Sequence, residues 1–161
     1  MSPHIDIGYI PTPLDAVQVA LELAVVTDQD ILYDLGCGDG RVVIAAAQQF
    51  GARGIGIDIN PDQIWAAQQK AEAAQVGDRV KFYVENLFES DFTEATVMFL
   101  YLLPHLNLKL KPRLLAKLRP GTRIISRDFD MGEWEPEQKI HLPDSEEPCT
   151  LYRWTVPPRV N

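Results

Sequence analysis

The chain has 161 residues, 46% of them hydrophobic and 24% charged, which is typical of one globular domain with a single core. Its net charge of −8 argues against nucleic acid and anionic membrane surfaces as partners, because both are bound through basic patches. The sequence has no apolar stretch long enough to span a membrane and no signal sequence, and its cysteines and histidines do not have the spacing of metal ligands. We therefore expect a cytoplasmic protein with no metal site and no membrane insertion.

Residues 1–28 are expected to form an extended, proline-containing segment followed by a helix. Thr12 is placed to cap this helix, and Pro13 and Asp15 fall in its first turn. Apolar residues recur at helical spacing to about Val26, which predicts a helix that covers one edge of a sheet.

Three glycines, Gly36, Gly38 and Gly40, separate a predicted buried strand at 31–35 from a predicted helix at 41–50. A strand, a glycine turn and a helix in this order place a small ligand at the carboxyl end of the strand. The third glycine comes one residue earlier than in the dinucleotide fingerprint, and Asp39 in the turn would repel a pyrophosphate. The turn therefore favours a ligand with a cationic end and no phosphate, and it disfavours a nicotinamide dehydrogenase.

A second strand is predicted at 53–59, and it carries Asp58 near its end. Asp58 follows Gly36 by 22 residues, the distance at which a βαβ unit brings a carboxylate to a ribose. Its two oxygens are suited to accept from both ribose hydroxyls. The alternative, that Asp58 only caps the next helix, is less attractive because Asn60 already precedes Pro61 in the capping position.

The middle of the chain reads as alternating helices and strands. A helix runs from Pro61 to about Gln75 and is closed by Gly77, and strands follow at 79–85 and 96–103. The second of these strands is continuously apolar, which is typical of a central strand covered on both faces.

The last third of the chain is expected to complete the sheet. A helix over 107–118, with a basic outer side that faces solvent, leads to a strand at 122–129. Strands at 138–142 and 149–156 are predicted to pair as a hairpin, and the tail 157–161 is expected to fray.

The stretch Asp34-Leu-Gly-Cys-Gly-Asp-Gly-Arg41 resembles the first motif of class I S-adenosylmethionine (SAM) dependent methyltransferases. The resemblance implies an α/β, Rossmann-like fold of one domain, 1–161, with helices on both faces of a seven-stranded, mostly parallel sheet. The last strand would be antiparallel and inserted before the sixth. Residues 1–28 would cover the cofactor, SAM, which leaves as S-adenosylhomocysteine (SAH).

The resemblance also implies which residues bind the cofactor. Asn86 follows the third strand, where it would read the adenine edge, although an Asx turn leaving the strand is the structural alternative. The complete predicted set is Tyr9, Thr12, Asp34, Gly36, Cys37, Gly38, Asp39, Gly40, Asp58, Ile59, Asn86, Leu87 and Tyr101.

Further stretches resemble one subgroup, the small bacterial methyltransferases related to the mitochondrial protein-lysine methyltransferases of the adenine nucleotide translocase and the ATP synthase c subunit. They are Tyr9-Ile-Pro-Thr12, Asn86-Leu-Phe88, Leu100-Tyr-Leu-Leu-Pro104, Trp134-Glu-Pro136 and Thr150-Leu-Tyr152. Two positions depart from the sequences of this subgroup. The loop 102–104 differs from that of the mitochondrial members, and Arg127 stands where related bacterial sequences often have His. These differences bear on the identity of the substrate and not on that of the cofactor.

This resemblance implies N-methylation of a protein lysine by in-line displacement, for which no catalytic base is obligatory. The neutral amine would be held about 3–3.5 Å from the methyl carbon, in a pocket whose desolvation lowers the pKa of the lysine. The residues expected to line that pocket are Tyr101, Leu103, Pro104, Asp128 and Trp134. A small-molecule methyltransferase and a SAM-binding protein without catalysis remain as alternatives, and the oligomeric state is not predicted.

Overall fold

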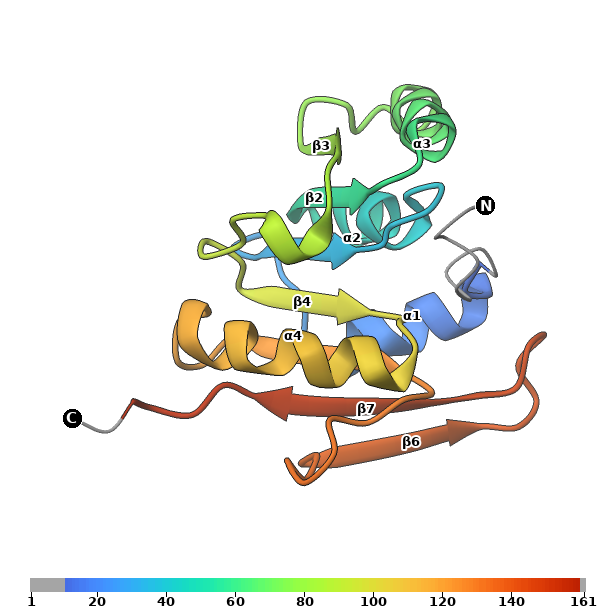
Figure 1. Cartoon of the computed structure of the whole chain (residues 1–161). Helices are drawn as coiled ribbons and strands as arrows, with labels where there is room; N and C mark the ends of the chain where they lie inside the picture. The colour runs from blue at the N-terminus through green and yellow to red at the C-terminus, as the bar shows by residue number, and fades with distance from the viewer. Residues whose placement is uncertain (1–10, 160–161) are drawn as a thin grey trace, which may run out of the picture.

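The computed structural model describes residues 11–159 of the chain. Its strands are β1 (Ile31–Leu35), β2 (Arg53–Asp58), β3 (Val80–Val84), β4 (Val97–Leu100), β5 (Arg123–Arg127), β6 (Gln138–Leu142) and β7 (Cys149–Thr155). They form one sheet in the order β3-β2-β1-β4-β5-β7-β6 (Figure 1). The pairs from β3 through to β5 are parallel, and β7 runs antiparallel between β5 and β6. The predicted class I methyltransferase sheet is thereby confirmed, including its inserted antiparallel strand.

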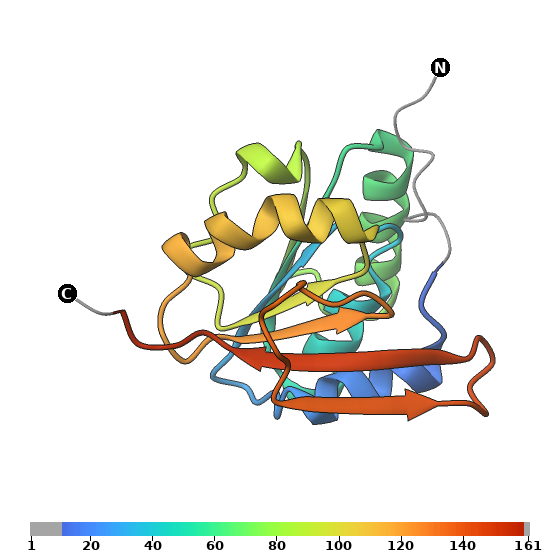
Figure 2. The ribbon, with the colours of Figure 1, turned by 60° about the horizontal axis from the view of Figure 1, so that its bottom comes forward.

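Helices cover both faces of this sheet. They are α1 (Leu14–Leu23), α2 (Arg41–Phe50), α3 (Pro61–Ala73) and α4 (Pro104–Lys117), with a short 3-10 turn, η2 (Leu87–Glu89). α4 lies over one face, while α1 and α2 lie over the other (Figure 2). Along β4, Val97 and Phe99 belong to the apolar cluster beneath α1 and α2, whereas Met98 and Leu100 belong to the cluster beneath α4. The apolar run of β4 is continuous because its side chains alternate between two covered faces.

Two helices end before the residues that the sequence predicts, and each is followed by a left-handed residue other than glycine. α1 stops at Leu23 and is followed by Val25, with φ of 54°. Arg153 donates to the carbonyl oxygen of Leu23 at 2.7 Å, and Arg123 donates to that of Ala24 at 2.8 Å. α3 ends at Ala73, and the left-handed position after it is taken by Gln75, with φ of 61°, and not by Gly77. At the end of α1, side chains from β5 and β7 thus satisfy carbonyls that have no partner within the helix.

The connection after β4 also differs from the prediction. The apolar run 96–103 divides, so that β4 ends at Leu100 and α4 begins at Pro104. Proline is well tolerated at the first position of a helix. None of the helices within residues 11–159 is long and apolar enough to span a membrane.

Candidate functional site

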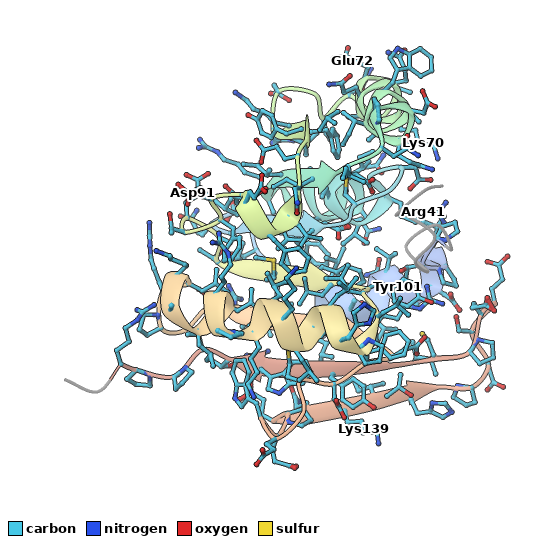
Figure 3. All side chains as sticks on the ribbon, in the orientation of Figure 1. Arg41, Lys70, Glu72, Asp91, Tyr101 and Lys139 are labelled. Atoms are coloured by element: carbon cyan, nitrogen blue, oxygen red, sulfur yellow. The ribbon has the colours of Figure 1, made fainter. Side chains whose placement is uncertain are left out.

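A cavity of about 450 Å³ opens at the carboxyl ends of β1, β2 and β4. This is the point in the sheet where the chain order reverses, since β1 pairs with β2 on one side and with β4 on the other. Arg41, Lys70 and Tyr101 all lie on the side of the molecule toward which β4 points, whereas Asp91 lies on the opposite side (Figure 3). The lining residues are Pro11, Thr12, Asp34, Gly36, Cys37, Gly38, Asp39, Arg41, Val42, Asp62, Gln63, Ala66, Phe99 and Tyr101.

The glycine turn forms one wall of this cavity. Its start is held against β2, because the N–H groups of Gly36 and Cys37 both donate to the carbonyl oxygen of Ile57, at 2.7 and 2.9 Å. Gly38 has a φ of 55°, and a Cβ there would meet no atom within 4 Å, so the backbone at Gly38 faces open space. At Gly40, with φ of 81°, a Cβ would lie 2.8 Å from the ring of Phe82. Gly38 therefore lets a ligand approach, whereas Gly40 lets the turn pack against its neighbours.

Asp58 bridges the turn and the following helix. Its Oδ2 accepts from the N–H of Gly38 at 2.9 Å, and its Oδ1 accepts from the N–H of Asn60 at 3.0 Å. Asn60 caps α3 through Asp62, as predicted. Asp58 is partly exposed and lies beside Gly38 without forming the cavity wall itself. Each carboxylate oxygen keeps a further lone pair for a ligand hydroxyl.

Asp39 does not present a free charge to the cavity. Its carboxylate accepts from Arg41 at 2.9 Å and from Lys70 at 2.6 Å. Burial by itself would raise the pKa of Asp39, but the hydrogen bonds and charges of Arg41 and Lys70 lower it to about 2. Because two cations neutralise this carboxylate, Asp39 repels a phosphate less than the sequence predicts.

Asp34 is the acid that remains open to a ligand. It is 4% exposed and lines the cavity, and no side-chain hydrogen bond or ion pair within residues 11–159 involves it. Burial, followed by the charges of Asp58 and Asp39, raises the pKa of Asp34 well above its usual range. A cationic group in the cavity would favour the ionised carboxylate. This buried acid fits the ammonium end of SAM.

Tyr101 and Thr12 form the opposite part of the site. The ring of Tyr101 stacks on Phe129 with centroids 6.3 Å apart, and the Arg127 guanidinium lies 4.1 Å from its centroid. Arg127 also donates to the Thr12 hydroxyl at 3.2 Å. Thr12 was expected to cap α1, but the residue in the N-cap position is Pro13, and the Thr12 hydroxyl is turned to Arg127 instead.

Several predicted residues lie at the same edge of the sheet but outside the cavity wall. Asn86 accepts from the N–H of Phe88 at 2.9 Å, which is the Asx turn considered as its structural role. The others are Ile59, Leu87, Leu103, Pro104 and Asp128, which follow the ends of β2, β3, β4 and β5. Tyr9 lies outside the described residues.

Trp134, which was predicted to line the acceptor pocket, is not among the residues that line the cavity. Its carbonyl oxygen accepts from Nε1 of Trp154 at 2.7 Å, and the two indole rings lie 5.9 Å apart. Trp154 pairs with Ile124 near the start of β5, so Trp134 lies toward the edge of the sheet opposite the cavity. The loop after β5 runs back along the sheet to the start of β6, and its Trp134, which is partly buried, packs against the apolar cluster beneath α4.

The first turns of α2 and α3 contribute cavity residues that the sequence reasoning missed. They are Arg41, Val42, Asp62, Gln63 and Ala66. α2 follows β1 through the glycine turn, and α3 follows β2 after two residues. Both strands end at the cavity, so the order of elements was the signal that pointed to these residues. Pro11 and Phe99 were also missed.

Comparison with known proteins agrees with this geometry. Residues 34–138 match the model of the ANTKMT methyltransferase domain. The chain is 40% identical over 155 residues to a protein-lysine N-methyltransferase from Saccharolobus islandicus (strain REY15A), covering 96% of this chain and 95% of that protein. It is 33% identical over 106 residues to the Mus musculus lysine N-methyltransferase of the ATP synthase c subunit, but it spans only 42% of that protein's length.

Solved structures resemble the fold as well. A crystal structure described as an RNA methyltransferase from Salinibacter ruber, in complex with SAH, has a TM-score of 0.90 and 50% identity, covering 94% of this chain and 97% of that one. A geranyl diphosphate C-methyltransferase from Streptomyces coelicolor A3(2) has a TM-score of 0.73 at 14% identity and shares the fold alone.

The sheet order, the glycine turn and the cavity at the reversal point define a class I SAM-dependent methyltransferase. The number of residues matched and the percentage of identical residues assign the chain to one family within this class. The chain belongs to the family of the ANTKMT methyltransferase domain.

Proposed function

We propose that this methyltransferase transfers the methyl group of SAM to the side-chain amine of a lysine in a protein. The observation that carries the proposal is the 40% identity, over nearly the whole of both chains, to a protein-lysine N-methyltransferase. The mouse relative, named as a lysine N-methyltransferase of an ATP synthase component, points in the same direction.

Residues of the cavity are suited to hold the cofactor, which supplies a methyl group on a sulfonium sulfur. Asp34 would pair with its ammonium group, because this buried carboxylate lines the cavity. Asp58 would accept from the ribose hydroxyls, with Gly38 leaving room beside it. For the adenine edge we retain Asn86 and Leu87, with the amide nitrogen of Asn86 as donor, since its oxygen already accepts from Phe88.

The acceptor side would be formed by Tyr101, Leu103, Pro104 and Asp128, which gather after the ends of β4 and β5. Methyl transfer to a neutral amine needs alignment and exclusion of water, and it does not require a protein base. A lysine that enters an enclosed pocket loses hydration, which lowers its pKa toward the neutral form.

The acidic turn between β6 and β7 supports a cationic substrate. It lies at the same edge of the sheet as the cavity (Figure 1), and Ser145 in this turn donates to Asp15 at the start of α1 at 2.9 Å. The charge of Glu146 in this turn reaches Arg41 in the cavity wall, whose pKa is raised chiefly by Asp39 with a contribution from Glu146. Negative charge at the cavity mouth favours a basic, lysine-bearing segment over a polyanion.

A second candidate acceptor is RNA, which is favoured by the description of the Salinibacter ruber structure. Two features weigh against it. The net charge is −8. Two of the basic side chains on α4 are engaged in packing, since Lys109 lies 4.2 Å from the ring centroid of Phe88 and Arg113 donates to the carbonyl oxygen of Ser90 at 2.7 Å. The basic side of α4 is thus partly used to hold the segment around η2, and RNA binding requires free basic side chains along one surface.

We also propose that the protein is located in the cytoplasm. Cys37 and Cys149 are free and buried thiols, which supports a reducing compartment such as the cytoplasm.

The proposal is tested by incubating the purified protein with methyl-labelled SAM and cell lysate from which endogenous SAM has been removed. Label that resists ribonuclease, is lost on protease digestion and elutes as methyl-lysine after acid hydrolysis is the expected result. The Gly38→Val variant controls for transfer by lysate enzymes. Label in ribonuclease-sensitive material or in small metabolites would replace the lysine assignment. Tight SAH binding without any transfer would identify a SAM-binding protein that lacks catalysis.

A further inference from the structure

Arg127, the last residue of β5, is an arginine buried in the sheet. It is 1% exposed, and its Nε has no hydrogen-bond partner within residues 11–159. Burial of a guanidinium is costly unless several contacts compensate it. The contacts that hold Arg127 therefore indicate what this charge does.

These contacts join three parts of the chain that are distant in sequence. Nη1 donates to the Thr12 hydroxyl at 3.2 Å and to the carbonyl oxygen of Pro11 at 3.4 Å. The guanidinium carbon lies 4.1 Å from the ring centroid of Tyr101. Pro11, Thr12 and Tyr101 all line the cavity, whereas Arg127 does not.

The position of Arg127 is itself fixed by its neighbour. Asp128 has a φ of 66°, which is unusual for a residue other than glycine, and its Oδ2 lies 3.6 Å from Nε of Arg127. Asp128 is held to β7 twice, because its N–H donates to the carbonyl oxygen of Thr150 at 2.7 Å and its Oδ1 accepts from the N–H of Thr150 at 2.9 Å. The charge partner of Arg127 is thus anchored to the sheet.

We propose that Arg127 is a positioning residue for methyl transfer, which holds Pro11 and Thr12 and the ring of Tyr101 in place as walls of the cavity. The planar guanidinium can stack on a ring with its face while it donates with its edge, which a lysine ammonium cannot do. It would act on the cofactor only through these walls. The effect on catalysis rests on the proposed function, but the effect on cofactor binding does not.

The test compares SAH affinity, measured by calorimetry without any acceptor, in Arg127→Met, Arg127→Lys, Thr12→Val and the double variant Thr12→Val/Arg127→Met. We expect both substitutions of Arg127 to raise the Kd by about tenfold, the scale of hydrogen bonds to a charged group. We expect Thr12→Val to raise the Kd in the wild-type background and to have little further effect in Arg127→Met, because the two residues act as one unit.

Arg153→Met is the matched control. Arg153 is also a largely buried arginine that donates to a backbone carbonyl, that of Leu23, and to a carboxylate, that of Glu137, but its contacts are remote from the cavity. It should lower the melting temperature without changing the Kd. If Arg127→Met does not fold, Arg127→Lys and Thr12→Val carry the comparison.

Three results would overturn the proposal. They are an unchanged Kd in both Arg127 variants, an equal rise of the Kd in Arg153→Met, and additive effects of Thr12→Val and Arg127→Met. If the wild-type chain binds SAH but transfers no methyl group, the proposal of lysine methylation fails. The role of Arg127 in binding is then still tested by the Kd values of the variants. If the wild-type chain binds no SAH, both proposals fail.

Discussion

The carboxylate of Asp58 accepts a hydrogen bond from the backbone N–H of Gly38, with 2.9 Å between Oδ2 and the nitrogen. This bond joins the end of β2 to the glycine turn that follows β1, and Gly38 itself faces the open cavity. The acid proposed to bind the ribose therefore also holds the backbone of the turn that lines the cavity. Loss of Asp58 would therefore affect both the proposed ribose contact and the position of the glycine turn.

Asp58→Ala should weaken SAH binding by about 1.5–3 kcal/mol, the scale of hydrogen bonds to a charged group, while circular dichroism shows an intact fold. An SAH analogue without ribose hydroxyls separates the two roles of Asp58. The wild-type protein should prefer SAH to the analogue, and Asp58→Ala should lose most of this preference. A preference that survives the substitution would assign the hydroxyls to another residue.

Gly38→Val should abolish measurable SAH binding, because a branched side chain there would project into the cavity. Gly121→Val is the matched control, since Gly121 also has a positive φ, 93°, and open space at its Cβ, but lies in the turn before β5 at the opposite edge of the sheet. Both variants should lose about 1–2 kcal/mol of unfolding free energy from backbone strain. If they bind SAH equally well, the ligand does not contact the glycine turn.

Much of this arrangement was predictable because it depends on short stretches of sequence and on chain order. The apolar runs 31–35 and 96–103, the glycines after the first run and the acid near the end of the second predicted strand are local signals. Parallel strands joined by right-handed crossovers then bring the ends of β1, β2 and β4 together. The sheet order and the position of the cavity follow from these rules.

Contacts between distant side chains were not predictable in the same way. Lys70 neutralises Asp39 from 31 residues away, and Arg127 turns the Thr12 hydroxyl away from the capping role across 115 residues. Trp134 was placed in the acceptor pocket because it follows β5, yet the direction of its loop is decided by packing on Trp154. Such pairings depend on the assembled core, which no single stretch of sequence encodes.

Asn107, which sequence reasoning did not single out, should be important for stability. It is fully buried on α4, and its Nδ2 donates to the Ser126 hydroxyl and to the carbonyl oxygens of Phe129 and Asp130 at 3.2–3.3 Å. Asn107→Ala should lower the unfolding free energy by about 2–3 kcal/mol in urea titrations, because it removes these bonds and leaves a cavity.

The exposed residue His105 on the same helix provides the control for this substitution. His105→Ala should change the unfolding free energy by less than about 0.5 kcal/mol. Alanine is the best helix former, so helix propensity cannot explain a loss in either variant. A loss of similar size in both variants would mean that the effect does not come from the buried amide.

Asp34 should make both stability and cofactor affinity depend on pH, in opposite directions. Its pKa is raised in the folded chain, chiefly by burial, so above the usual carboxyl pKa of about 4 the folded chain binds more protons than the unfolded chain, and stability falls as pH rises. Asp34→Asn removes this dependence, so in urea titrations its stability relative to wild type should increase between pH 5 and pH 8.

The affinity for SAH should change with pH in the opposite direction. The ammonium of SAH favours the ionised carboxylate of Asp34, so the affinity of the wild-type protein should rise between pH 5 and pH 8, whereas that of Asp34→Asn should be weak and nearly constant. An affinity that does not depend on pH in the wild-type protein would place the ammonium away from Asp34.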